Sequence, residues 1–225
     1  MYELIITNKN YSSWSMRAWV LLRAAGIPFT ERLLRYRPGG FRPQSPSGRV
    51  PCLRDGELLV WDTLAITEYL AERHAGVWPQ EAPARAWARS AAAEMHSGFN
   101  ALRNECSMSV GVRLRRHGIS SGLQTDLVRL AELWEEGLAR HGGPFLGGAG
   151  FTAVDAFFAP VATRVQTYAL PLPAPAAAYA QRLLQVPAVA QWIMDGIAET
   201  FRDASHEEEV LAQGVLLADL RAGAS

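Results

Sequence analysis

The sequence contains little cysteine: Cys52 and Cys106 are its two cysteines among 225 residues, and they stand far apart. Because they form no C-x-x-C pair, no disulfide framework, thiolate zinc site or dithiol redox motif is indicated. None of the five histidines belongs to a metal-ligand pattern, so we expect no metal ion. Two reduced thiols are typical of an intracellular protein, and we expect a cytoplasmic location.

The chain also lacks net charge and long apolar runs. Lys plus Arg and Asp plus Glu both number 22, and no dense basic stretch occurs, so we expect no nucleic-acid partner. No uninterrupted apolar run approaches the roughly 18 residues of a membrane span, and the start MYELIITNKN lacks a signal-peptide pattern. With 49% hydrophobic and 20% charged residues, the composition is that of a globular protein without a membrane segment.

Strand and helix signals alternate through residues 1–76. The isoleucine-rich YELIITN and the alternating FTERLL flank WSMRAWVLLRAAG, whose apolar residues recur at helical spacing. This β-α-β order predicts two parallel strands joined by a crossover helix. After a loop at 35–49 rich in proline and glycine, the dipeptide Asp55-Gly56 predicts a hairpin, and DTLAITEYLAERHAG predicts a further helix.

Strand signals stop at about residue 82, after a linker at 77–83. The alanine-rich segment 83–110 predicts one long helix, and GLQTDLVRLAELWEEGLARHGG predicts an amphipathic one. FTAVDAFFAPVATRVQTYAL is almost wholly apolar, which predicts a helix buried on all sides. Helices are also expected in AAAYAQRLLQ, in PAVAQWIMDGIAETF and within 203–225. The predicted fold class is an α/β domain at 1–76 followed by an all-helical domain at 84–225.

Two adjacent serines, Ser12 and Ser13, stand at the start of the first predicted helix in NYSSWSMRAW. A serine at this position can cap the helix. Its hydroxyl can also donate to an anion, because free N–H groups and the helix dipole favour negative charge there. No histidine or lysine base accompanies the serines in a motif, so we expect a hydrogen-bond donor and not a nucleophile.

Four motifs together resemble the cytosolic glutathione transferase superfamily, in its bacterial, serine-type form. They are YSSWSMRAW, SGRVPCL, WDTLAITEYL and FTAVDAFFAPV. The serine motif is nearest to that of the zeta class, the maleylacetoacetate isomerase-like enzymes, although Trp14 takes the place of a cysteine. The resemblance implies a thioredoxin-like domain followed by a helical domain, a buried capping box of Thr152 and Asp155, and a homodimer.

The resemblance also implies where glutathione binds. Val50 would precede a cis Pro51 and pair through its backbone with the cysteinyl part of glutathione. Asp62 and Thr63, at a helix N-terminus, would bind the γ-glutamyl group. Asp62 can equally be a plain helix cap, and the family more often has Glu-Ser or Gln-Ser at this pair.

The resemblance also indicates which serine would contact the sulfur. The choice depends on how many residues separate the serine from Arg17, the arginine of the first predicted helix. In zeta, tau and phi relatives this serine lies five residues before the arginine, which selects Ser12. A theta-like spacing of four selects Ser13 as the second choice. We expect Ser12 to face the sulfur and Ser13 to support the turn or cap.

The implied activity is that of a glutathione transferase, with glutathione as co-substrate. The serine would stabilise its thiolate for attack on a small hydrophobic electrophile. Trp14 and the expected helical segment 96–116 would border the electrophile pocket, with Met108 and Val112 among its lining residues. The alternatives are a zeta-type glutathione-dependent isomerase and a non-enzymatic glutathione-binding or stress protein on the same fold.

Overall fold

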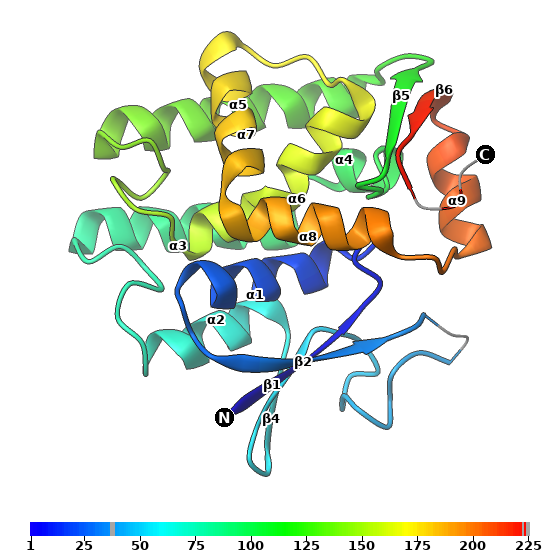
Figure 1. Cartoon of the computed structure of the whole chain (residues 1–225). Helices are drawn as coiled ribbons and strands as arrows, with labels where there is room; N and C mark the ends of the chain where they lie inside the picture. Colours follow the sequence, from blue (N-terminus) through cyan, green and yellow to red (C-terminus); the bar gives the residue numbers. More distant parts are fainter. Residues whose placement is uncertain (37–38, 222, 224–225) are drawn as a thin grey trace.

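The computed structural model describes residues 1–36, 39–221 and 223. Residues 37–38 of the expected loop at 35–49, and residues 222 and 224–225 of the expected tail, lie outside the described residues. The described part of the chain forms a small sheet with its helices and a larger, mainly helical part stacked against them (Figure 1).

The sheet and its helices come from the first third of the chain. Their elements are β1 (Tyr2–Thr7), α1 (Ser13–Ala24), β2 (Phe29–Leu34), β3 (Cys52–Asp55), β4 (Leu58–Trp61) and α2 (Thr63–Ala71). β1 and β2 are parallel, which confirms the predicted β-α-β unit, and β3 and β4 form the predicted antiparallel hairpin. The strand order is β2-β1-β3-β4. The Val50–Pro51 peptide bond is cis, as the resemblance implies.

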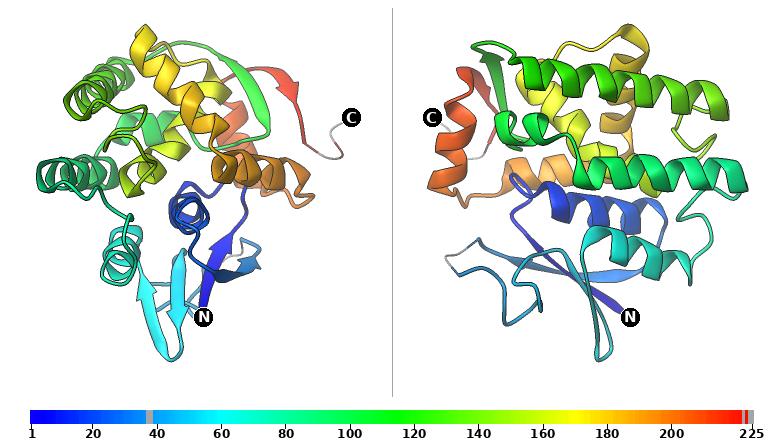
Figure 2. Two further views of the ribbon diagram at one scale, coloured as in Figure 1. Left: turned by 60° about the vertical axis from the view of Figure 1, so that its left-hand side comes forward. Right: turned by 180° about the vertical axis from the view of Figure 1, so that it is seen from behind.

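Helices dominate the rest of the chain. They are α3 (Ala82–Ser97), α4 (Asn100–Glu105), α5 (Ser121–His141), α6 (Ala153–Tyr168), α7 (Ala174–Gln185), α8 (Pro187–Ala198) and α9 (Ala204–Leu211). α6 is buried along almost its whole length, as its apolar sequence predicts. α1 lies between the sheet and the helical part, and it packs against α6 and α8 (Figure 2). The N-terminus of α1 therefore stands where the two parts meet.

The prediction of a single long helix at 83–110 is wrong. α3 ends at Ser97, Phe99 adopts a left-handed conformation with φ +55°, and α4 begins at Asn100. Arg103 stabilises the break, because its Nε donates to the Gly98 carbonyl at 3.0 Å and its Nη2 to the His96 carbonyl at 3.0 Å. These carbonyls would otherwise lack partners at the end of the helix.

The expectation of helices alone after residue 82 also needs correction. β5 (Val112–Arg116) and β6 (Gly214–Asp219) pair antiparallel as a small second sheet. Within the expected tail helix at 203–225, residues 204–211 are helical and residues 214–219 are this strand. The partner of each strand lies about a hundred residues away, so neither segment has the adjacent hairpin partner that marks β3 and β4.

Asp155, the third residue of α6, joins three segments in the core. Its side chain is fully buried and accepts from the backbone N–H of Thr152 at 2.9 Å and of Leu146 at 3.0 Å. The Tyr179 hydroxyl on α7 donates to it at 2.7 Å. This geometry confirms the capping box of Thr152 and Asp155.

Ion pairs hold the C-terminal segment, α9 and β6, together, and hydrogen bonds fasten it to the turn before α1 and to the chain before β5. Arg221 is 7% exposed, pairs with Asp219 at 2.6 Å and also pairs with Glu207. Glu207 accepts a further hydrogen bond from the Tyr11 hydroxyl at 2.5 Å. The backbone N–H of Leu220 also donates to the Gly111 carbonyl at 2.8 Å. α9 is therefore held beside the turn that precedes α1.

Replacing Asp155 by Ala should lower the free energy of unfolding by about 3 kcal/mol, because three buried donors lose their acceptor. Urea denaturation followed by circular dichroism measures this change. Glu72→Ala is the control: its exposed carboxylate pairs with Arg73 at 2.9 Å, and we expect a change within about 0.5 kcal/mol. Equal effects of the two substitutions would contradict the role of Asp155.

Acid should release the C-terminal segment before it unfolds the core. Hydrogen bonds from Arg221 lower the pKa of Asp219. Burial acts to raise the pKa of Glu207, but hydrogen bonds from Arg221 and Tyr11 outweigh it and lower that pKa too. Depressed carboxylate pKa values stabilise the fold above the ordinary pKa of about 4, and this stabilisation is lost as the pH falls through the folded value.

Amide hydrogen exchange, corrected for intrinsic rates, can follow this release. Protection of the β5–β6 amides should fall as the pH drops below about 4, while α6 keeps its protection. Asp219→Asn should show weakened protection of β6 already near neutral pH. Simultaneous loss of protection in β6 and α6 would contradict the prediction.

Candidate functional site

Two adjoining cavities lie at the junction of the sheet part and the helical part. The larger, of about 480 Å³, reaches from the start of α1 to α4, α6 and α9. The smaller, of about 300 Å³, lies at the start of α2. The two share three lining residues, Trp14, Arg49 and Val50, so they lie side by side, and we call the pair the groove.

Ser12 and Ser13 both line the larger cavity, at the first turn of α1. Ser12 is the N-cap: its Oγ accepts from the Ser15 backbone N–H at 3.3 Å and donates to Ser15 Oγ at 2.9 Å. Ser13 is the first helical residue and is 8% exposed. From the sequence we expect Ser13 to support the turn or cap, but Ser12 is the cap. The helix already begins at Ser13, so the capping position is the residue before it.

The residues expected to bind glutathione gather in the smaller cavity. Val50, Pro51, Asp62 and Thr63 all line it. Asp62 caps α2, with its Oδ1 accepting from the Leu64 N–H at 2.8 Å, and has a left-handed backbone with φ +74°. Such strain in a residue other than glycine is found at functional sites more often than elsewhere. Asp62 is thus held at the helix start with its second oxygen facing another group.

That group is His96 of α3, which the sequence did not predict for the site. Its Nε2 lies 3.4 Å from Asp62 Oδ2, and its Nδ1 lies 3.4 Å from Thr63 Oγ1. Burial lowers the pKa of His96, Arg17 and Arg103 lower it further, and the Asp62 carboxylate only partly opposes them. No local motif marks His96, since it reaches Asp62 only through the packing of α3 on α2.

Trp14 stands between the two cavities with cationic groups around it. The Arg17 guanidinium lies 4.3 Å from its ring centroid and that of Arg103 lies 4.8 Å away. The His96 ring meets the indole edge to face at 5.1 Å. Arg17 is only 2% exposed, and its Nε and Nη1 have no hydrogen-bond partner among the described residues. Ring faces of Trp14 and Phe157 supply cation–π stabilisation instead.

The structure separates the three residues expected to line the electrophile pocket. Trp14 and Met108 line the larger cavity, together with Ser12. Val112 instead lies in β5, is 1% exposed and packs in the core, so its assignment to the pocket is wrong. The expected helix at 96–116 would have placed Val112 one turn from Met108. The chain is extended there, which moves its side chain elsewhere.

α9 adds a wall that the sequence did not predict. His206 and Glu209 line the larger cavity. The His206 ring stacks on Tyr11 at 5.1 Å, and its Nδ1 lies 2.8 Å from the Asp203 carboxylate. A carboxylate at Nδ1 orients the imidazole and directs Nε2 as the remaining acceptor. Because His206 and Tyr11 lie near opposite ends of the chain, only the fold brings them together.

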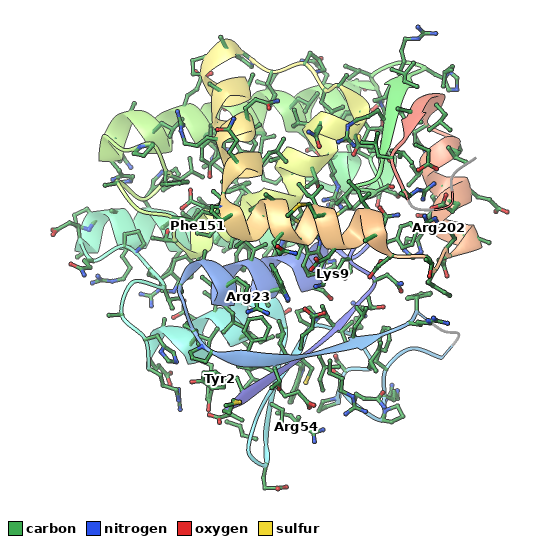
Figure 3. All side chains as sticks on the ribbon, in the orientation of Figure 1. Tyr2, Lys9, Arg23, Arg54, Phe151 and Arg202 are labelled. Carbon is green, nitrogen blue, oxygen red and sulfur yellow. The ribbon has the colours of Figure 1, made fainter. Side chains whose placement is uncertain are left out.

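The turn that carries these serines is anchored to α8 and the sheet. Lys9 lies where the start of α1 meets α8 (Figure 3), and its Nζ pairs with Asp195 at 2.7 Å and with Glu31 at 2.8 Å. Its backbone N–H donates to Glu199 Oε1 at 2.8 Å. These contacts fix the direction in which the chain enters α1, and with it the position of Ser12.

Across the described ranges, no helix has the length and apolar character needed to cross a membrane. Among the same residues, no group of three or more His, Cys, Asp or Glu side chains is arranged to hold a metal ion. Cys52 and Cys106 are both buried and free, and burial raises the pKa of each thiol.

Several solved structures share this fold. A glutathione transferase homologue from Burkholderia gl BGR1, with bound glutathione, is 24% identical, with a TM-score of 0.65 over 87% of this chain and 97% of that chain. A theta class glutathione S-transferase from Xanthomonas axonopodis pv. citri, with glutathione bound, is 25% identical, with a TM-score of 0.64 over 86% and 97%. Glutathione transferase Omega 3C from Trametes versicolor is 16% identical, with a TM-score of 0.66 over 90% of each chain.

No curated protein sequence matches this chain. Two family models do match, one after the other along the sequence. Residues 11–73 match the N-terminal domain of glutathione S-transferases, and residues 85–193 match their C-terminal domain. With its thioredoxin-like β/α domain followed by a helical domain, the chain belongs to the glutathione S-transferase family.

Proposed function

We propose that this protein is a glutathione transferase in which Ser12 stabilises the thiolate of glutathione for attack on an electrophile in the larger cavity. The observation that carries this proposal is the pair of adjoining cavities that form the groove, with Asp62 and Thr63 at one end and Ser12 at the other. Val50 lines both cavities between them. Glutathione is a tripeptide with charged ends and a central thiol, and the groove offers partners in that order.

The smaller cavity fits the γ-glutamyl end of glutathione. Its ammonium can pair with Asp62, and its carboxylate can accept from the N-terminus of α2, where Thr63 begins the helix. The backbone of Val50, before the β3 strand, can then pair with the cysteinyl peptide as an added strand would. These contacts place the sulfur in the larger cavity.

The energy that Ser12 must supply is within the range of one hydrogen bond. A thiol with a pKa of about 8.5 is roughly 3% ionised near neutral pH, and lowering that pKa by about two units requires ~2.7 kcal/mol. A hydroxyl that donates to an anion supplies ~1.5–3 kcal/mol, and the N-terminus of α1 adds about 0.3–1 kcal/mol. The nearby cations Arg17 and Arg103 act in the same direction.

Ser12 can make this bond without losing its structural role. Its hydroxyl proton points to Ser15 Oγ in the structure, and rotation about the C–O bond redirects it into the cavity. After this rotation the second lone pair of Oγ can face the Ser15 N–H, so the helix remains capped. The sulfur then bonds to the electrophilic carbon while the leaving group departs with the electron pair of the broken bond.

A homodimer and a cytoplasmic location complete the proposal, and both rest on the resemblance to the superfamily. Sedimentation velocity on the full chain measures the oligomeric state directly. The zeta-type isomerase and the non-enzymatic binding protein are the outcomes against which the transferase proposal is tested.

Ser12→Ala should raise the pKa of the thiol of bound glutathione by about one to two units. It should also lower kcat/KM near neutral pH by about 10- to 100-fold. Thiolate absorbance and conjugation of a chloronitrobenzene measure the two effects. Loss of the cap should also lower the free energy of unfolding by about 1 kcal/mol. Ser13→Ala is the matched control and should keep the thiolate pKa of the wild type. Equal thiolate yields in all three proteins would refute the role of Ser12.

Asp62→Asn should raise the KM for glutathione about tenfold with little change in kcat, because the ammonium loses its anionic partner far from the sulfur. Asn caps helices as well as Asp does, so the fold should be retained. Glu68→Gln, on the same helix and paired with Arg89 at 2.8 Å, should leave the KM unchanged. A wild-type KM in Asp62→Asn would remove Asp62 from the glutathione site.

A further inference from the structure

Arginines form part of the inner wall of the larger cavity. Arg103 of α4 and Arg164 of α6 both line it, and Arg17 lies behind Trp14. Arg164 is 6% exposed and Arg17 is 2% exposed, so two of the three charges are almost removed from water. Buried charges of one sign are costly unless an opposite charge compensates them.

Backbone carbonyls, and not carboxylates, hold the two lining arginines. Arg164 donates from Nε to the Cys106 carbonyl at 2.7 Å and from Nη1 to the Pro160 carbonyl at 3.1 Å. Arg103 donates from Nε and Nη2 to the carbonyls at the end of α3. Within the part of the chain that the structure describes, neither guanidinium forms an ion pair. Both are thus rigidly positioned without a carboxylate in direct contact, and Asp126 acts on Arg103 only from a longer distance.

One nitrogen of each guanidinium remains available to a ligand. Nη1 of Arg103 and Nη2 of Arg164 bind no protein group among the described residues. Unlike Nε and Nη1 of Arg17, neither is sealed from solvent. Both side chains line the cavity, so an anion there meets the guanidinium groups that carry these nitrogens.

The electrostatics of the wall agree with an anionic ligand. Burial and the neighbouring Arg103 lower the pKa of Arg164 to about 10, and burial together with Arg103 and Arg164 lowers that of Arg17 well below its ordinary value. Glu209 on α9 also lines the cavity, and its Oε2 accepts from Ser107 Oγ at 3.1 Å. An anion near the arginines would relieve their mutual repulsion.

We propose that the electrophile is an organic acid, whose carboxylate binds Arg103 and Arg164 while its apolar part lies against Met108 and Trp14. Planar carboxylates match the donors of guanidinium groups, and Met108 is a 3% exposed apolar neighbour in the same wall. This inference rests on the proposed transferase function and replaces the expected small hydrophobic electrophile by an amphipathic, negatively charged one.

A matched pair of substrates tests the charge preference. In para-chloro-meta-nitrobenzoate and the corresponding benzamide, the glutathione sulfur bonds to the ring carbon that carries chlorine, and chloride leaves with the bonding electrons. Each kcat/KM is divided by the uncatalysed rate, because the two rings differ in reactivity. The corrected ratio of benzoate to benzamide should be about tenfold or more in the wild type. A ratio near one would overturn the proposal.

Arg103→Met and Arg164→Met should each lower this ratio about tenfold, chiefly by raising the KM for the benzoate. Arg113→Met is the control, because Arg113 lies in β5 and pairs with Gln166 at 2.7 Å outside the cavity lining; it should keep the wild-type ratio. An equal loss with both substrates, together with a raised thiol pKa, would show that the arginines act on the sulfur and would overturn the proposal.

Binding without glutathione separates this inference from the proposed function and needs no variant. Calorimetry on the wild type should show that the benzoate binds about tenfold or more tightly than the benzamide. If neither compound is conjugated but the benzoate binds selectively, the transferase proposal fails while the carboxylate site stands. If both are conjugated but bind with equal affinity, the carboxylate site fails and the transferase proposal stands.

Discussion

The carboxamide oxygen of Asn10 joins the two segments that form the cavity. Asn10 is fully buried, and its Oδ1 accepts from the backbone N–H groups of Val110 at 3.0 Å and Gly111 at 3.1 Å. Ser12 follows two residues after Asn10, and Met108 precedes Val110 by two. One side chain therefore sets the distance between the serine turn of the first domain and the opposite wall in the second. The break between α3 and α4 also contributes, because it directs the chain toward Val110 and so toward Asn10.

The two ends of the groove carry side chains of opposite charge, and Trp14 lies between them. On one side Asp62 presents a carboxylate at the start of α2, which favours a cationic ligand group. On the other, Arg103 and Arg164 present positive charge that forms no ion pair among the described residues, with Glu209 on the α9 side. The indole is large enough to contact Arg17, Arg103 and His96 at once, and its ring faces stabilise arginines that form no ion pair within the described ranges. A cysteine at this position would remove the ring that Arg103 stacks on and would leave Arg17 with the ring of Phe157.

The C-terminal segment completes the cavity although it lies beyond the matched domain, which ends at residue 193. α9 contributes His206 and Glu209, and β6 pairs with β5, which follows directly on the wall that contains Met108. Its attachment depends on Arg221 and on Tyr11, one residue before Ser12. One end of the groove is therefore closed by a segment outside the matched domains, whereas Val50, Asp62 and Thr63 at the other end lie within the matched N-terminal domain.

The sequence by itself determined the order of elements in the first domain, the buried helix α6 and the placing of Ser12, Asp62 and Thr63 at helix starts, and its resemblance to the superfamily added the capping box of Thr152 and Asp155. These features depend on short-range signals: periodicity, turn dipeptides and residues that cap a helix within three positions. Only the tertiary structure decided the break at Phe99, the pairing of β5 with β6, the contact of His96 with Asp62 and the access of Arg103 and Arg164 to the cavity. Each of these depends on contacts between segments far apart in the chain, for which a local sequence pattern contains no signal.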